Sequence, residues 1–169
     1  MKTRLCLLTL CVMAVSFGGG CSDEPAADAT TAASMDWLLD ELPGGDVVGV
    51  AQARQGVAVG DAVMVRGVIG GRLEPMTPDA GLFVIMDLGL RSCVDMGEDH
   101  CATPWDYCCE PSDEVARNAA TVQVRDESGV PVALGRALAP LDEVVVIGIA
   151  APGTSADALI IHAWGVVLE

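Results

Sequence analysis

Four cysteines fall within a short internal stretch and offer the chain its most distinctive chemistry. They are Cys93, Cys101, Cys108 and Cys109, which lie within 17 consecutive positions. In an oxidising compartment such thiols pair as disulfides, and four of them permit three pairings. A direct Cys108–Cys109 bridge requires an unusual backbone, so we expect each of these two residues to pair with Cys93 or Cys101. Two such bridges would stabilise a long loop that buries little apolar surface.

Metal ligation is the second chemistry open to this segment. Thiolates from the four cysteines, with the imidazole of His100, would select zinc, copper(I) or an iron–sulfur centre. Against this, the segment has no Cys-x-x-Cys pair. The carboxylates around the cysteines are Asp95, Glu98, Asp99, Asp106 and Glu110. They could hold calcium, but their spacing matches no EF-hand loop. A metal site is therefore the alternative to disulfides, which would need no cofactor.

Redox activity is a third interpretation of the same thiols. A reactive cysteine needs a lowered thiol pKa. Seven acidic residues lie between Asp95 and Glu114, with Arg91 as the nearby cation, and they would raise that pKa instead. The rest of the chain has no Ser/His/Asp arrangement, no phosphate-binding glycine loop and no pair of carboxylates with a catalytic spacing. We therefore expect a protein that is not an enzyme.

Trp105, Asp106 and Tyr107 lie inside the cysteine segment and are the candidate binding residues. If bridges form, the two aromatic rings would pack over them or against the barrel predicted below. An ordered loop of this kind would serve as a recognition element or as a stabilising one.

The charge of the chain limits its partners. Residues 1–20 contain two of the nine basic residues. The rest of the chain has seven arginines against 24 acidic residues and a formal charge of −17. Phosphate backbones are bound through lysine and arginine, so this balance argues against nucleic acid and anionic lipid headgroups. Cationic ligands or metal ions suit it better, alongside an unidentified protein or glycan partner.

Residues 1–20 have the features of a secretory signal peptide. Lys2 and Arg4 are followed by an apolar run, Leu5–Phe17, and then by three glycines. A run of 13 residues is too short to span a bilayer. Small residues directly before Cys21 resemble the bacterial lipobox, although Gly18 stands where that motif usually has leucine. The resemblance implies lipidation of Cys21, membrane attachment through that lipid, and a place in the bacterial cell envelope facing the periplasm or the exterior.

The segment after the anchor is expected to be a tether. Residues 22–34 are mostly Asp, Glu, Pro, Ala and Thr, with little apolar surface to bury. Ser34–Leu42 predicts a short helix that Ser34 caps and that Pro43 and Gly44 end. We therefore assign residues 21–56 to a lipid-anchored tether with this helix and residues 57–169 to the folded domain.

The folded domain is predicted to be mainly β. Five candidate strands are separated by Gly, Pro and Asp, and they cover residues 62–69, 82–87, 120–125, 143–150 and 158–168. The third alternates most clearly, with Val122 and Val124 facing inward. Glycines inside the first and fourth strands are typical of tightly coiled barrels. We expect a small five-stranded barrel with a long cysteine-rich loop between its second and third strands.

The strand order, with Gly60–Gly67 and later Val144–Gly148, resembles the OB-fold over about residues 57–168. Pro131, Gly135 and Pro140 occupy the region where OB-folds usually have a helix, so we expect that helix to be missing or reduced to a turn. OB-folds often bind oligonucleotides. The strands here lack the aromatic and basic residues that such binding requires, so we do not expect it.

Residues 101–110, Cys-Ala-Thr-Pro-Trp-Asp-Tyr-Cys-Cys-Glu, resemble a segment of uncharacterised bacterial exported lipoproteins that have similar OB-like strands. That resemblance implies no activity. The sequence as a whole predicts an exported, lipid-anchored binding or interaction module with a disulfide-stabilised loop, and the alternative is a metal-binding or redox protein that uses the same cysteines.

Overall fold

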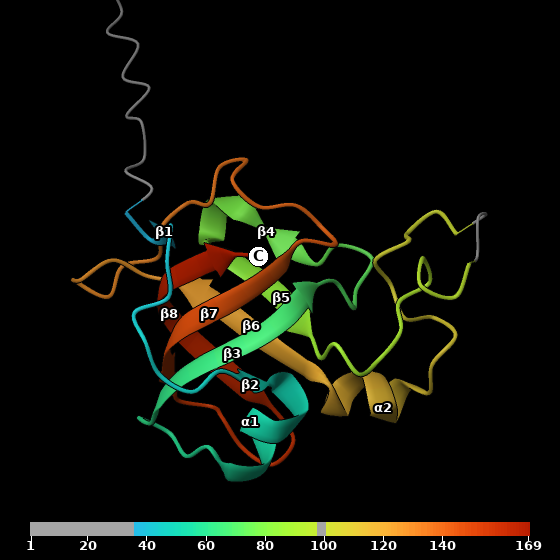
Figure 1. Ribbon diagram of the computed structural model, residues 1–169, viewed down its shortest axis with the longest axis horizontal. Coiled ribbons are helices and arrows are strands. Elements are labelled where there is room, and N and C mark those ends of the chain that lie inside the picture. The colour runs from blue at the N-terminus through green and yellow to red at the C-terminus, as the bar shows by residue number, and fades with distance from the viewer. Residues whose placement is uncertain (1–35, 98–100) are drawn as a thin grey trace, which may run out of the picture. The chain divides into compact units, whose positions relative to one another are not determined.

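Five strands form a closed barrel in the computed structural model, which describes residues 36–97 and 101–169. They are β3 (Ala62–Ile69), β5 (Leu82–Met86), β6 (Ala119–Val124), β7 (Glu143–Ala150) and β8 (Leu159–Leu168). Their order around the barrel is β3-β7-β8-β6-β5, and β5 pairs again with β3 to close it (Figure 1). All neighbours are antiparallel except β6 and β8, which are parallel.

The five predicted strands are confirmed, and so is the OB-like arrangement. Two of the five have the predicted bounds, β5 and β8 differ by one residue at one end, and β6 is shifted by one residue at both ends. The first strand pairs with the second and the fourth, and the third pairs with the fifth. Residues 125–142 connect β6 to β7 without a helix, as Pro131 and Pro140 indicated.

Alternating side chains fill the barrel interior. Val63, Val65 and Ile69 face inward from β3, and Val122 and Val124 face inward from β6. These five side chains are at most 7% exposed. Burial of one such side chain contributes roughly 1.5–3 kcal/mol, so the interior is the main source of stability.

The N-terminal part of the described chain differs from the prediction. The predicted helix is wrong over its described residues, because Trp37 is buried in the core and β1 (Leu38–Leu39) pairs parallel with β8. Ser34, the predicted cap, lies outside the described residues, as do residues 1–33 and Met35. Tertiary pairing with an existing strand outweighs the weak helical preference of so short a segment.

Residues 48–56 also belong to the barrel domain and not to a tether. β2 (Val48–Gly49) pairs parallel with β3, and α1 (Val50–Gly56) buries Val50 and Ala53 in the core. The first turn of α1 has no capping side chain of its own, because Gly49 is its N-cap. Asp87 supplies one from the end of β5, where its Oδ2 accepts a hydrogen bond of 2.8 Å from the N–H of Ala51. The folded domain therefore begins before residue 57.

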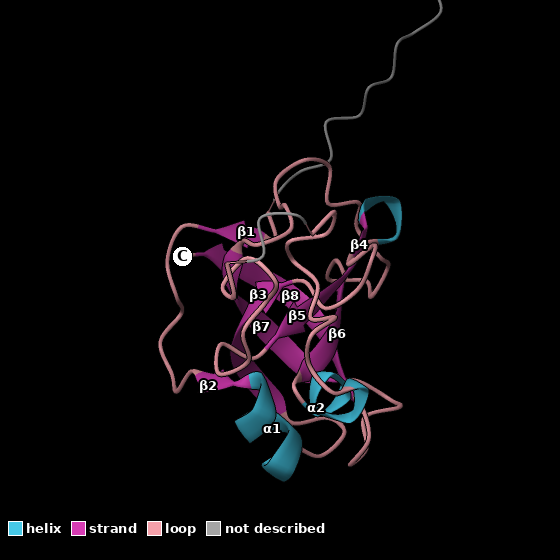
Figure 2. Ribbon diagram, turned by 90° about the vertical axis from the view of Figure 1, so that its right-hand side faces the viewer, coloured by secondary structure: helices cyan, strands magenta, loops and turns pink. Residues whose placement is uncertain are grey.

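Three short elements complete the described structure. β4 (Met76–Thr77) pairs with β5, the 3-10 helix η1 (Pro78–Ala80) follows it, and α2 (Ser112–Arg117) precedes β6. Figure 2 shows α1 and α2 near one end of the barrel. None of the helices in the described ranges has the length and apolarity needed to cross a membrane.

A β-bulge interrupts the pairing of β7 with β8. Ile147 pairs with Gly165 and the next residue, Gly148, pairs with Ala163, so Trp164 is the extra residue of β8. A Cβ atom on Gly148 would lie 2.3 Å from the carbonyl oxygen of His162. Glycine at position 148 is therefore what lets the two backbones approach at the bulge.

We expect Gly148→Ala to lower the free energy of unfolding by about 1–3 kcal/mol, because its methyl group would overlap β8. The matched control is Gly56→Ala at the end of α1, where the added methyl group meets open space. That change should raise the free energy of unfolding by about 0.5–1 kcal/mol. Urea denaturation of both variants is the measurement, and equal stabilities would contradict the role given to Gly148.

Candidate functional site

The cysteine loop, residues 87–118, connects β5 to β6 and projects from one side of the barrel (Figure 1). Its two ends meet, because the N–H of Asp87 donates to the carbonyl of Asn118 at 2.8 Å. Its middle is held against the β3–β4 connection, where the N–H of Gly71 donates to the carbonyl of Trp105 at 2.9 Å. The loop is thus attached to the barrel at its ends and at its centre.

Two backbone hydrogen bonds inside the loop bring distant cysteines together. The N–H of Cys93 donates to the carbonyl of Asp106 at 2.8 Å, and the N–H of Val94 donates to the carbonyl of Pro104 at 3.0 Å. Residues 93–94 therefore run beside residues 104–106. This pairing places the Sγ of Cys93 3.3 Å from the Sγ of Cys108.

Three of the four predicted cysteines form one cluster. The Sγ atoms of Cys93, Cys108 and Cys109 all lie within 4.8 Å of one another. Cys93 is buried, whereas Cys108 and Cys109 are exposed. We call these three residues the thiol cluster; it has a buried floor and an open side.

Cys101, the fourth cysteine, lies half-buried beside the cluster. Its Sγ is 3.4 Å from the carbonyl oxygen of Thr103 and 3.8 Å from that residue's Oγ1. The other predicted metal ligand, His100, lies outside the described residues, with Glu98 and Asp99. The described structure therefore places three sulfurs together and Cys101 at their margin.

The thiols differ in how easily they ionise. Burial, and then a hydrogen bond with Cys108, raises the pKa of Cys93 to about 11. Hydrogen bonds with the backbone and the side chain of Thr103 lower the pKa of Cys101. The hydrogen bond with Cys93 lowers the pKa of Cys108, but the adjacent Cys109 and burial outweigh it, so the net direction is upward. A cation in the cluster would therefore have to displace protons from Cys93 and Cys108.

The three candidate binding residues have different environments. Tyr107 is buried and packs with Val84 and Met86. The half-buried Trp105 donates its indole N–H to the carbonyl of Arg72 at 3.1 Å. Asp106 accepts a hydrogen bond of 2.7 Å from the N–H of Tyr107 through Oδ1. The contacts of Tyr107 and Trp105 attach the loop to the barrel and to the β3–β4 connection, whereas the Asp106 bond is internal to the loop. Tyr107 lies directly before the exposed pair of cysteines.

One nearby carboxylate is already engaged. Asp95 accepts hydrogen bonds from the hydroxyl of Ser92 at 2.6 Å and from its N–H at 2.9 Å through the same oxygen. The Ser92 side chain and then its backbone lower the pKa of Asp95. These bonds close a tight turn around Cys93, so Asp95 orders the loop on the buried side of the cluster.

A second candidate site lies on the outer face of the barrel and was not predicted from the sequence. It is a groove of about 490 Å³ that runs over β3, β7 and β8. Trp164 forms one of its walls and is 52% exposed. The available signal was a tryptophan that alternates with the inward-facing Ile161 and Ala163, but the groove beside it depends on the pairing of β8 with β7.

Comparison of the chain with protein-family models, with curated proteins and with solved structures finds no match.

The chain has a single tyrosine, so the environment of Tyr107 can be measured directly. Burial, followed by the charges of Asp95 and Asp87, raises its pKa to about 12. A raised tyrosine pKa means that the neutral ring stabilises the fold fully below pH 10, and that this contribution is lost as the pH rises towards 12. Ultraviolet titration of tyrosinate should show the shift.

The control for this titration is Tyr107→Phe, which keeps the ring but has no ionisable group. Its free energy of unfolding should fall less steeply between pH 10 and 12 than that of the natural chain. A tyrosine that titrates near pH 10 in the folded protein would show that the loop does not pack on Val84 and Met86 as described.

Proposed function

We propose that this chain is an exported, lipid-anchored binding module whose thiol cluster binds a thiophilic metal ion, zinc or copper(I). The observation that carries the proposal is the approach of three Sγ atoms, from Cys93, Cys108 and Cys109, to within 4.8 Å of one another. Soft sulfur ligands favour these two ions over magnesium or calcium.

The distances in the thiol cluster suit a metal ion. Zinc–sulfur bonds of about 2.3 Å in a tetrahedral site place two sulfur ligands about 3.8 Å apart. Small side-chain rotations from the described positions would reach that spacing. A disulfide joins only two sulfurs, whereas a metal ion uses all three and leaves a fourth position for Cys101 or water.

Access and charge also support metal binding. Cys108 and Cys109 are exposed, so an ion can reach the buried Cys93 between them. The chain has 24 acidic and nine basic residues, and the resulting field attracts cations. The same field opposes nucleic acid, which is not among the partners we propose.

The anchor is proposed from the sequence alone, since residues 1–35 lie outside the described structure. Lipidation of Cys21 would hold the barrel at the surface of a bacterial membrane, facing the periplasm or the exterior. The acidic chain would then meet metal ions, or a protein or glycan partner, in that compartment.

A disulfide-stabilised binding module is the second candidate function, and one distance favours it. The sulfurs of Cys93 and Cys108 are 3.3 Å apart, and a modest shift would join them. Cys101 and Cys109 would then be the remaining pair. In that case the loop would be a stapled recognition surface without a metal.

We expect the full mature chain, purified under reduced conditions, to bind about one zinc or copper(I) ion. Cys108→Ser and Cys109→Ser each remove an exposed ligand and should weaken binding about tenfold or more, a loss at least as large as that from altered outer-shell groups. Glu110→Gln is the matched control beside the cluster and should bind normally. Elemental analysis and competition with a chromophoric chelator are the measurements.

Intact mass spectrometry of the same protein from its native membrane separates the two candidate functions. A metal adduct under native conditions with four alkylatable thiols supports the metal site. A metal-free chain that lacks two hydrogens per bridge and resists alkylation would exclude the metal site and support the stapled module.

The anchor makes its own prediction. We expect a mature chain that begins at Cys21 and has a diacylglyceryl-type mass on that residue, and we expect Cys21→Ser to release the protein from the membrane fraction. A mature chain that begins elsewhere, with unmodified mass, would rule out lipidation while leaving the metal site untouched.

A further inference from the structure

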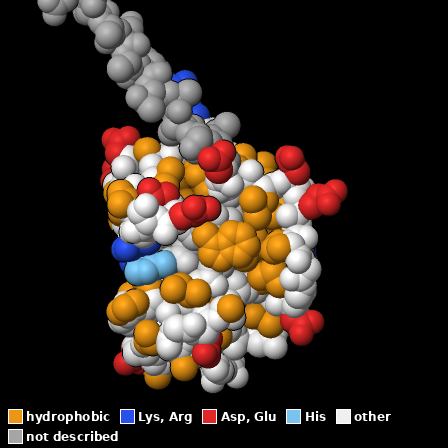
Figure 3. Space-filling view, turned by 90° about the vertical axis from the view of Figure 1, so that its left-hand side faces the viewer, with side chains coloured by type: hydrophobic (Ala, Val, Ile, Leu, Met, Phe, Trp, Pro, Cys, Tyr) orange, Lys and Arg blue, Asp and Glu red, His pale blue; other side chains and the backbone are white. Residues whose placement is uncertain are grey.

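The outer face of β7 and β8 is apolar and only partly covered. Val145, Ile147 and Val167 point outward there and are buried under Leu39, Leu42 and other side chains of the N-terminal segment. Pro43 and Gly44, which follow Leu42, form one side of the groove. Figure 3, which looks onto this side of the molecule, shows hydrophobic side chains gathered together with acidic ones around them.

Trp164 belongs to none of the hydrophobic core clusters of the described residues. It is the extra residue of the bulge, and it is 52% exposed although it is the largest side chain on β8. It faces outward beside β7, where Gly148 has no side chain to fill the groove. Bulges of this kind often aim a side chain at a ligand.

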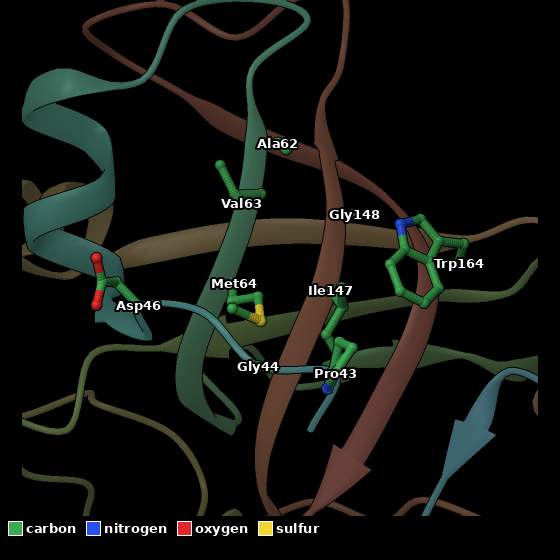
Figure 4. Close-up of a pocket in the computed structure, with 9 residues that line it drawn as sticks. All are labelled: Pro43, Gly44, Asp46, Ala62, Val63, Met64, Ile147, Gly148 and Trp164. Carbon is green, nitrogen blue, oxygen red and sulfur yellow. The ribbon is translucent and has the colours of Figure 1, made fainter. Parts of the chain in front are cut away.

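The two ends of the groove differ in chemistry. Figure 4 shows Asp46 at one end and Trp164 at the other, with Met64, Ile147 and Pro43 between them. Asp46 is exposed, and no ion pair within the described residues uses its carboxylate. No basic residue lines the groove. Along its length the groove therefore has a carboxylate at one end, an apolar floor in the middle and an aromatic ring at the other end.

We propose that this groove binds a linear organic cation of the polyamine class. One ammonium group would pair with the exposed Asp46 carboxylate once its side chain rotates towards the groove, the methylene chain would lie along Met64 and Pro43, and a second ammonium group would lie over the face of Trp164. Tryptophan is the best aromatic partner for a cation. The volume of about 490 Å³ lies in the range of small-molecule sites, and the formal charge of −15 for the whole chain supplies long-range attraction.

The lining of the groove argues against a neutral sugar. Asp46 is the only lining side chain that can hydrogen bond with hydroxyl groups along the length of the groove, apart from the indole N–H of Trp164. Sugar sites need several such groups to replace water. A ligand with charged ends and an apolar middle needs polar partners only where the groove has them.

The test uses the ¹⁵N-labelled mature chain titrated with spermidine at constant ionic strength, observed through the backbone and indole N–H signals, so that variants at position 164 still report binding. Trp164→Leu identifies the signal of that residue and should weaken binding about fivefold, the equivalent of one cation–π contact. Asp46→Asn should weaken it about two- to fivefold. The matched controls are Ile149→Ala, an exposed residue of β7 outside the groove, and Glu127→Gln, an exposed carboxylate in a distant turn. Both should bind like the natural chain.

Two further probes decide the class of ligand. A neutral diol of the same length should leave the Trp164 signal unmoved, and magnesium should not reproduce the shift. Equal effects of spermidine and magnesium, or unchanged affinity in both groove variants, would overturn the proposal. Binding of an arginine-rich peptide without binding of spermidine would overturn it too, in favour of a protein partner. The Cys109→Ser variant should bind spermidine normally, because no cysteine lines the groove.

Discussion

The barrel closes where the last two residues of β3 pair with β5, and the cysteine loop begins directly after this closure. The closure consists of two residue pairs, Val68 with Met86 and Ile69 with Ile85. Gly67 makes it feasible, since a Cβ atom there would lie 2.7 Å from the carbonyl of Met86. The chain leaves β5 directly after this closure to form the cysteine loop, and Gly71, just beyond β3, holds the loop at Trp105. Closure of the barrel and ordering of the loop therefore depend on the same few backbone contacts.

That attachment also explains why Cys93 is buried while Cys108 and Cys109 are exposed. The N–H of Cys93 donates a hydrogen bond to the carbonyl of Asp106. The carbonyl of Tyr107 accepts a hydrogen bond from the N–H of Glu110, which follows the exposed cysteines. The buried Tyr107 ring anchors the chain immediately before Cys108. The buried sulfur of Cys93 thus lies beneath the exposed sulfurs of Cys108 and Cys109, and this arrangement suits capture of an ion from solvent. The groove at Trp164 draws on a different part of the barrel, so the two sites are structurally independent.

The sequence predicted the five barrel strands well, because runs such as Val122 and Val124 alternate with polar residues and Gly or Pro marks the ends. It did not predict β1, β2 or α1. Each of these is short, and each exists because a neighbouring strand or the core stabilises it, which a local pattern does not report. Helical spacing near Trp37 gave the wrong element for the same reason. The cysteines were identified as the chemical centre, but which sulfurs meet depends on the path of the loop. Trp164 continues the outward-facing side of β8 after Ile160 and His162, and the groove beside it depends on how β7 pairs with β8.

The parallel pairing of β1 with β8 gives the molecule a defined point of mechanical weakness. Only Leu38 with Val166 and Leu39 with Val167 hold this ladder, whereas β3 and β7 share a ladder of seven pairs. Tension that enters the domain from the chain before Asp36 loads β1 first. Peeling of β1 would lift Leu39 and Leu42 from the outer face of β7 and β8 and widen the groove beside Trp164 while the barrel stayed closed. A pull on the N-terminal side of the domain would in this way expose one face of a barrel that stays closed.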